Sequence, residues 1–323
     1  MSKKPPQRIM VTGAAGFVGS HLVEHLLDAG RDVIAIDNFH DYYDPSRKQS
    51  NADCFRQRDG ITFYEADIRD ADAIRRIFRD HEPQAVAHLA ALANVRYSIG
   101  RASEYTDVNV TASVLLLEAA RQVGCDQFVF ASTSSVYGKT DKLPFEESDP
   151  CNHPLAPYPA SKKAVEVMGY TYHNLHEMNF TAVRFFSVYG PRGRPDMMPF
   201  MVTDRIVKGE TIKLFDGGQM KRDWTYVEDI VAGVAAALDR PLGYQLINLG
   251  RGEPVLMADF VHIIEQLVGK KAVLETPPAP ASEPPVTFAN IEKARKLLAY
   301  APQTPIHDGL AKLWAWYQAE MAE

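Results

Sequence analysis

The sequence predicts an α/β fold with a doubly wound parallel sheet, because strand-like and helix-like segments alternate through its first half. The strand-like segments are nearly continuous apolar runs, which are typical of strands covered by helices on both faces. The segments between them carry apolar residues at helical spacing. Alternation of this kind favours parallel strands joined by helical crossovers, as in a Rossmann sheet. The predicted strands are 8–13, 32–37, 61–67, 85–90, 127–132 and 180–190, and the predicted helices are 17–29, 70–81, 104–123 and 158–178.

The second half of the chain has shorter elements and more proline. We expect a Rossmann domain over residues 1–190 and a smaller C-terminal α+β domain over residues 191–323, with elements near 227–250 as candidates for return to the first domain. Ligands of open α/β sheets bind beyond the carboxyl ends of the strands, so the smaller domain should lie over that edge. Its predicted elements are helices at 199–208, 227–239, 257–268 and 306–321 and a strand at 211–215.

The composition limits the kinds of partner. The 323 residues include 35 basic and 41 acidic side chains, a formal net charge of −6, which gives the chain no overall attraction for nucleic acid or an anionic membrane. No apolar run is long enough to span a bilayer, and the first residues lack the apolar stretch of a secretory signal. The three cysteines have no paired spacing, which argues against a disulfide framework or a zinc site. We therefore expect a cytoplasmic protein without a metal.

Three glycines between the first predicted strand and the first predicted helix indicate a dinucleotide site. Gly13, Gly16 and Gly19 lie in the segment GAAGFVG, where they permit a tight turn, the approach of a pyrophosphate and close helix–strand packing. The helix N-terminus offers free N–H groups to the phosphates. Asp37 ends the second strand, where a carboxylate accepts hydrogen bonds from a ribose diol and repels a 2′-phosphate. These features favour NAD over NADP.

A tyrosine and a lysine four residues apart indicate a reaction centre. Tyr158 and Lys162, in the segment YPASK, would project from one face of a helix. The lysine ammonium and a positive nicotinamide ring both favour phenolate, which should lower the pKa of Tyr158. The phenolate would take a proton from a substrate hydroxyl while hydride leaves the same carbon. Thr133, in ASTSSVYG at the end of the fifth strand, would hold the substrate oxygen. An isolated pair of this kind would equally fit an ordinary helix surface.

The glycine spacing, ASTSSVYG and YPASK together resemble the extended short-chain dehydrogenase/reductases. The resemblance runs from Ile9 to about Trp314 and narrows to the UDP-glucuronate 4-epimerases through HLAALANVRYS, SVYGPRGRPDMMPF and IKLFDGGQMKRDWTYVEDI. It implies that Asp67 and Ile68 border the adenine, although Asp67 could also cap the following helix. The full set of cofactor-binding candidates is Gly13, Gly16, Phe17, Gly19, Asp37, Asn38, Asp67, Ile68, Ala90, Ala91, Asn109, Tyr158 and Lys162.

The same resemblance implies how a UDP-sugar is bound and what happens to it. Phe215 would lie against the uracil and Arg222 would grip the diphosphate, for which a guanidinium is well suited. Ser134 and Ser135 stand where related 4,6-dehydratases carry an Asp–Glu pair and related decarboxylases a Glu. A serine hydroxyl cannot replace those carboxyl groups as a general acid or base at neutral pH. The 4-keto sugar would therefore take the hydride back, and presentation of its other face would invert C4.

A uronic sugar adds a requirement, because its 4-keto form is a β-keto acid that tends to lose carbon dioxide. Its carboxylate must be held by hydrogen bonds that favour the charged group. Arg194 is the candidate clamp, assisted by Ser135 and Ser187, and Arg96 is a second possibility. The alternative for Arg194 is a structural ion pair with Asp196 or contacts with loop carbonyls.

We therefore expect NAD-dependent conversion of UDP-glucuronate to UDP-galacturonate. A UDP-glucose or UDP-pentose 4-epimerase is the alternative, and a UDP-glucuronate decarboxylase or a sugar nucleotide 4,6-dehydratase is less favoured. A descendant of the fold that only binds is disfavoured, because Thr133, Tyr158 and Lys162 are all present. The resemblance also suggests a homodimer formed through helices 104–123 and 158–178.

Overall fold

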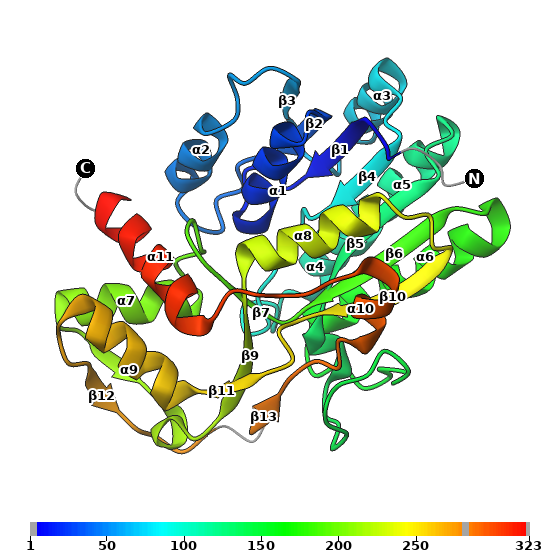
Figure 1. Cartoon of the computed structure of the whole chain (residues 1–323). Coiled ribbons are helices and arrows are strands. Elements are labelled where there is room, and N and C mark those ends of the chain that lie inside the picture. Colours follow the sequence, from blue (N-terminus) through cyan, green and yellow to red (C-terminus); the bar gives the residue numbers. More distant parts are fainter. Residues whose placement is uncertain (1–4, 280–283, 321–323) are drawn as a thin grey trace.

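The computed structural model describes residues 5–279 and 284–320, and within them seven parallel strands form one sheet in the order β10-β6-β5-β4-β1-β2-β3 (Figure 1). This order, 3-2-1-4-5-6 with an added strand, is that of a Rossmann sheet, so the predicted fold class is confirmed. The strands are β1 (Arg8–Thr12), β2 (Asp32–Asp37), β3 (Ile61–Glu65), β4 (Ala85–His88), β5 (Gln127–Thr133), β6 (Asn179–Phe185) and β10 (Tyr244–Leu249).

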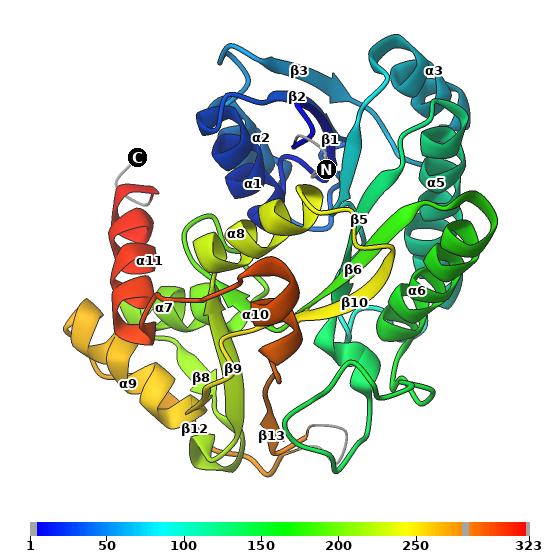
Figure 2. The same ribbon diagram turned by 45° about the vertical axis from the view of Figure 1, so that its right-hand side comes forward.

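Helices cover both faces of this sheet, which explains why its strands are apolar throughout (Figure 2). On one face α1 (Phe17–Asp28) packs against α8 (Val227–Leu238). On the other face α5 (Ala112–Gln122) packs against both α3 (Ala71–His81) and α6 (Pro157–His176). Each face has its own cluster of buried apolar side chains. The sheet is therefore the middle layer of three.

The strand order reverses between β1 and β4, and this switch point determines where a ligand can bind. The connection after β1 turns to one side of the sheet and the connection after β4 to the other, which leaves a crevice beyond their carboxyl ends. α2 (Pro45–Asp53), between β2 and β3, and α4 (Ala102–Thr106), after β4, lie in connections that leave this edge. The candidate site is built there.

The C-terminal part adds short strands and helices below this edge in Figure 1. β7 (Ser187–Tyr189), β11 (Pro254–Leu256) and β13 (Val286–Thr287) each pair with β9 (Lys221–Tyr226), and β8 (Thr211–Lys213) pairs with β12 (Val273–Glu275). Its helices are α7 (Met198–Lys208), α9 (Met257–Val268), α10 (Glu292–Leu298) and α11 (Ile306–Glu320). Between these elements the chain returns to the sheet, where β10 pairs with β6. A division of the chain at residue 190 stays a prediction.

One predicted helix is continuous but contains an irregular turn, and one predicted strand is interrupted. The helix expected over 104–123 consists of α4, a π-helical turn η1 (Asp107–Thr111) and α5. Asn109, within η1, bonds the backbone of Leu92 through its side chain, so the wider turn serves a tertiary contact. The strand expected over 180–190 breaks at Phe186, whose ring enters a separate cluster with Tyr137 and Phe145, and β7 then joins β9 instead of the main sheet.

No helix among the described residues has the length and apolar character needed to cross a membrane. Over the same residues, no group of three or more His, Cys, Asp or Glu side chains is arranged to hold a metal ion.

Candidate active site

A cavity of about 760 Å³ lies at the carboxyl edge of the sheet and is lined by residues from both halves of the chain. Among the predicted site residues, Asn109 and Phe215 do not line it. The predicted residues that do are Gly13, Gly16, Phe17, Gly19, Asp37, Asn38, Asp67, Ile68, Ala90, Ala91, Arg96, Thr133, Ser134, Ser135, Tyr158, Lys162, Ser187, Arg194 and Arg222.

The glycine turn forms one end of the cavity and has no room for side chains. Gly13 has φ +70°, and a Cβ placed on it would lie 2.7 Å from the backbone N of Ala90. A Cβ on Gly19 would lie 2.0 Å from the carbonyl oxygen of Gly13. Gly16 is the N-cap of α1 and brings no capping side chain, so the first N–H groups of the helix are open to an anion. This cradle fits a diphosphate.

Asp37 and Lys48 form the next part of the wall. The carboxylate of Asp37 accepts hydrogen bonds from the backbone N–H groups of Ala15 at 3.0 Å and Phe39 at 2.9 Å. Burial raises the pKa of Asp37, while the Lys48 ammonium and the backbone donors oppose that rise. Lys48 is itself buried and donates to the carbonyl of His40 at 2.7 Å. No sequence pattern indicates Lys48, because it lies in a polar stretch that is typical of an exposed surface.

Asp67 is held at the cavity by its neighbours and does not cap a helix. Asp70 caps α3 by accepting from the N–H groups of Asp72 and Ala73, so the alternative role considered for Asp67 is wrong. Asp67 instead accepts from Arg69 and, at 3.0 Å, from the Asn38 amide. The Arg69 guanidinium lowers the pKa of Asp67 to about 2, which keeps it charged.

Asn109 lies behind the cavity wall. Its side chain accepts from the N–H of Leu92 at 2.9 Å and donates to the Leu92 carbonyl and to Ser161 Oγ, both at 3.0 Å. It is almost fully buried. Asn109 thus connects the loop after β4 to the helix that carries Tyr158 and Lys162.

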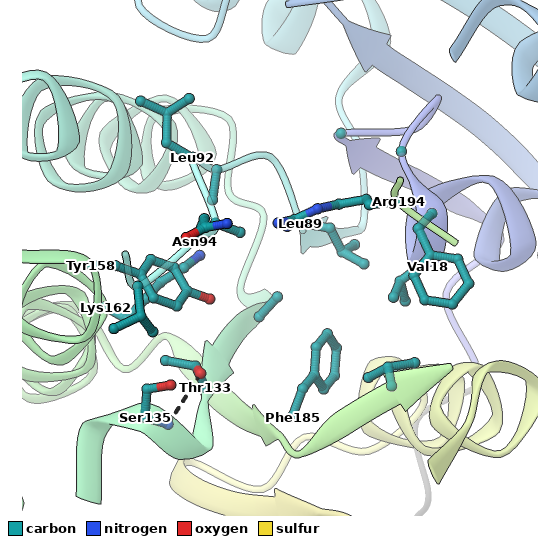
Figure 3. A pocket seen from close by; sticks show the side chains of 18 of the residues that line it. Val18, Leu89, Leu92, Asn94, Thr133, Ser135, Tyr158, Lys162, Phe185 and Arg194 are labelled. Carbon is teal, nitrogen blue, oxygen red and sulfur yellow. Dashed lines mark hydrogen bonds between the residues drawn. The ribbon is translucent and has the colours of Figure 1, made fainter. Parts of the chain in front are cut away.

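Tyr158, Lys162 and Thr133 lie close together on one side of the cavity, as Figure 3 shows. Tyr158 and Lys162 lie one turn apart near the start of α6, and Thr133 ends β5. Thr133 Oγ1 accepts the N–H of Ser135 at 3.2 Å, which directs its hydroxyl toward Tyr158. The Lys162 ammonium lies 4.6 Å from the centre of the Phe130 ring.

Burial is the largest influence on the pKa values of Tyr158 and Lys162. Burial raises the pKa of Tyr158, while its hydrogen bond with Thr133 and the charge of Arg194 act in the opposite direction. Burial also lowers the pKa of Lys162 to about 7. Without NAD, desolvation therefore outweighs the charge of Arg194. The predicted fall in the pKa of Tyr158 includes the charge of the nicotinamide ring and stays a prediction.

The candidate substrate residues come from both halves of the chain. Arg194 is paired with Asp196 at 2.9 and 2.7 Å, the ion pair considered as its alternative role. The Arg96 guanidinium lies over the ring of Phe215, 5.9 Å from its centre. Phe215 therefore contacts a residue of the cavity wall without lining the cavity itself. Arg222, on β9, donates to the Pro284 carbonyl at 2.9 Å.

The comparisons with known proteins agree with this arrangement. Residues 9–250 match the model of the NAD dependent epimerase/dehydratase family. The chain belongs to that family.

Its relatives include a UDP-glucuronate 4-epimerase from Thermodesulfobacterium geofontis, 41% identical over 95% of this chain and 95% of that protein. UDP-glucuronate 4-epimerase 4 of Arabidopsis thaliana is 41% identical over 96% of this chain and 75% of its own length. The UDP-glucuronic acid 4-epimerase of Bacillus cereus, solved with UDP-glucuronic acid and NAD, has a TM-score of 0.89 at 32% identity and covers 97% of this chain and 99% of its own. The UDP-glucose 4-epimerase of Thermotoga maritima has a TM-score of 0.88 at 29% identity, with the same coverage.

As a member of this family the chain uses NAD, and its residues fit that cofactor. The space left by Gly13 and Gly19 and the open start of α1 suit the diphosphate, and the buried carboxylate of Asp37 suits a ribose diol. Tyr158 and Lys162 stand at the far end of the same cavity. When bound, NAD supplies an acceptor for hydride and later its donor.

Sequence reasoning missed several residues of this epimerase/dehydratase site. Tyr42, Tyr43 and Lys48 follow β2, in a segment without a recognisable motif. Asn94 follows β4 within HLAALANVRYS, but that segment predicts no contact for it. Asp196 was named only as a partner of Arg194. The one available signal was position, because loops that follow parallel strands at the switch point converge on the ligand.

Proposed function

We propose that this protein converts UDP-glucuronate to UDP-galacturonate by NAD-dependent inversion at C4. The observation that carries the proposal is the juxtaposition, in one cavity, of Tyr158 and Thr133 with two serines and an arginine. Ser134 and Ser135 leave no acid beside the reacting carbon, and Arg194 offers a cation for a sugar carboxylate. The relatives that carry the name UDP-glucuronate 4-epimerase support this assignment.

Tyr158 moves the proton in each half of the reaction. Its phenolate accepts the proton of the C4 hydroxyl while Thr133 holds that oxygen by a hydrogen bond. The hydrogen bond with Thr133 and the charge of Arg194 act against the burial that raises the pKa of Tyr158, and a protonated Lys162 and the bound nicotinamide would act in the same direction. After the 4-keto sugar has turned its other face toward the cofactor, Tyr158 returns the proton to the same oxygen.

The rest of the UDP-sugar is assigned to the residues after 190. Phe215 would pack against the uracil and Arg222 would bind the diphosphate, so residues 191–323 would form the domain that binds the substrate. Arg194 would hold the sugar carboxylate with help from Ser135 and Ser187, and Arg96 is the second candidate. The position of Arg96, Arg194, Arg222 and both serines around the cavity supports these assignments.

A UDP-glucose or UDP-pentose 4-epimerase is the second candidate. Arg194 is already neutralised by Asp196, an arrangement that a neutral sugar would leave undisturbed. The fold is also close to that of the UDP-glucose 4-epimerase of Thermotoga maritima.

We further propose that the enzyme is a cytoplasmic homodimer. The three thiols are unpaired, as is usual in a reducing compartment. α6 carries an apolar stripe at helical spacing that is partly or largely exposed. This stripe consists of Ala160, Ala164, Val167, Met168 and Leu175. A two-fold partner would cover it with an identical stripe.

The experiment is to incubate the purified protein with UDP-glucuronate, UDP-glucose and UDP-xylose separately and to resolve the products by NMR. We expect UDP-galacturonate from the first sugar at a kcat/KM at least tenfold above those for the neutral sugars. Tyr158→Phe should lower kcat by about 10²- to 10⁴-fold with NAD still bound. Preferential turnover of a neutral sugar, or full activity of Tyr158→Phe, would overturn the proposal.

A further inference from the structure

Asp196 lies at the junction of three loops that surround the cavity. Its Oδ2 accepts hydrogen bonds from Tyr42 Oη at 2.8 Å, Asn94 Nδ2 at 2.8 Å and Arg194 Nη2 at 2.7 Å, and its Oδ1 accepts from Arg194 Nε at 2.9 Å. Tyr42 follows β2, Asn94 follows β4, and Arg194 follows β7. All four side chains line the cavity. Asp196 is thus the common acceptor for three otherwise separate segments.

The pairing leaves part of Arg194 available. A guanidinium has five N–H groups on two usable edges, and Asp196 occupies the edge formed by Nε and Nη2. The other edge, formed by Nη1 and the second N–H of Nη2, can bind another carboxylate through two parallel hydrogen bonds. Figure 3 shows Arg194 extended across the pocket toward Asn94. Its side chain is 18% exposed and that of Asp196 is 25% exposed, so the pair is shielded but reachable.

The same cluster is connected to the catalytic tyrosine. The Asn94 carbonyl accepts from Tyr105 Oη at 3.0 Å, and the Tyr105 ring meets the Tyr158 ring edge-on at 6.2 Å. The charge of Arg194 also acts on Tyr158. A shift of Arg194 would therefore be felt where the proton is transferred.

We propose that Asp196 is a positioning residue that fixes the guanidinium plane of Arg194 and directs its second edge toward the carboxylate of the sugar. The proposal rests on the proposed function, since it requires a uronic substrate. Tyr42 and Asn94 fix Asp196 in turn, so the clamp is a set of three loops held by one carboxylate.

The chemical consequence is control of a side reaction. In the 4-keto sugar the C5–C6 bond can break, with its electron pair passing into the C4 carbonyl as an enolate while carbon dioxide leaves. The enolate is then protonated at C5. Two hydrogen bonds stabilise the carboxylate as the anion and hold it in a fixed plane. They thereby keep the C5–C6 bond out of the orientation in which carbon dioxide can leave. A loosened Arg194 should therefore release a decarboxylated sugar.

The test compares Asp196→Asn with the parent on UDP-glucuronate. The amide nitrogen cannot accept a hydrogen bond, so the variant must lose the partners of one carboxylate oxygen, either Arg194 Nε at Oδ1 or the three donors at Oδ2, and it also loses the negative charge that pairs with Arg194. We expect kcat/KM to fall at least tenfold and the fraction of decarboxylated product, measured by NMR and by release of carbon dioxide, to rise at least fivefold. A role in folding alone would lower the amount of active enzyme without changing that fraction.

Asp204→Asn is the matched control. Asp204, on α7, likewise accepts from a cation, Lys208, and from a tyrosine, Tyr317, but it lies outside the cavity lining. Its variant should keep the parental product fraction. An unchanged fraction in Asp196→Asn would overturn the inference, whereas a parent inactive on UDP-glucuronate would overturn the proposed function.

Discussion

At the scale of single residues, the site depends on polar groups that are buried but fully hydrogen-bonded. His88, at the end of β4, bonds Thr12 Oγ1 through Nδ1 at 2.7 Å and Ser113 Oγ through Nε2 at 2.8 Å. Ser113 donates its proton to the Asn109 carbonyl, so it must accept from His88, and the histidine is neutral with its proton on Nε2. This series of hydrogen bonds connects β1 and the end of β4 to the helical turn that contains Asn109.

The neutral state of His88 predicts a loss of stability in acid. Burial, and then the charge of Lys162, lower the pKa of His88 to about 3, whereas an unfolded histidine binds its proton near its ordinary value of 6.5. Between these values the unfolded chain binds more protons, so stability is complete above pH 6.5 and falls as the pH drops. Between pH 7 and pH 5 the titration of His88 should lower the free energy of unfolding by about 2 kcal/mol.

Urea unfolding of the parent and of His88→Gln at both pH values measures that contribution. Burial and the charge of Arg192 also lower the pKa of His21, to about 4, but that effect is common to both proteins. The variant should be less stable at pH 7 and should lose about 2 kcal/mol less than the parent on acidification. Equal losses in the two proteins would show that His88 is not the group that titrates.

At the scale of elements, the cofactor turn is set by how closely α1 approaches β1. Gly19, in the first turn of α1, lies against the carbonyl of Gly13, and Gly13 lies against Ala90, two residues beyond β4. The turn after β1, the first turn of α1 and the segment after β4 therefore meet without side chains between them. The open N–H groups of α1 can reach a diphosphate only because this contact is so close.

Gly19→Ala should push α1 away from the sheet. A methyl group 2.0 Å from a backbone oxygen cannot be accommodated by a side-chain movement, so we expect a loss of about 3 kcal/mol and at least tenfold weaker NAD binding. Gly30→Ala, just beyond the C-terminus of α1, is the control: φ is +72° but no atom lies within 4 Å of the new methyl. Gly30→Ala should lower the free energy of unfolding by about 1 kcal/mol and leave the affinity for NAD unchanged. Unfolding and fluorescence titration with NAD measure both effects.

At the scale of the whole molecule, the sequence predicts what is encoded locally and misses what depends on distant pairing. GAAGFVG and YPASK predict the cofactor turn and the helix proposed to be catalytic, because the spacing of their residues carries the chemistry. The contacts of Asp196 with Tyr42 and Asn94 join residues 154 and 102 positions apart, and no local pattern records them. The return of β10 to the sheet was left open for the same reason, since only tertiary pairing with β6 decides it. The division into domains and the assembly of subunits remain predictions at this scale.

The proposed homodimer gives the last prediction. Val167 is 54% exposed and lies at the middle of the α6 stripe, where a two-fold partner would place the same residue nearby. Val167→Glu would bring two like charges into that interface and should weaken the dimer at least tenfold, as measured by analytical ultracentrifugation. Val273→Glu, on β12 in the C-terminal part and 51% exposed, should leave the mass unchanged. A parent that sediments as a monomer, or a Val167→Glu variant that stays dimeric, would rule out this interface.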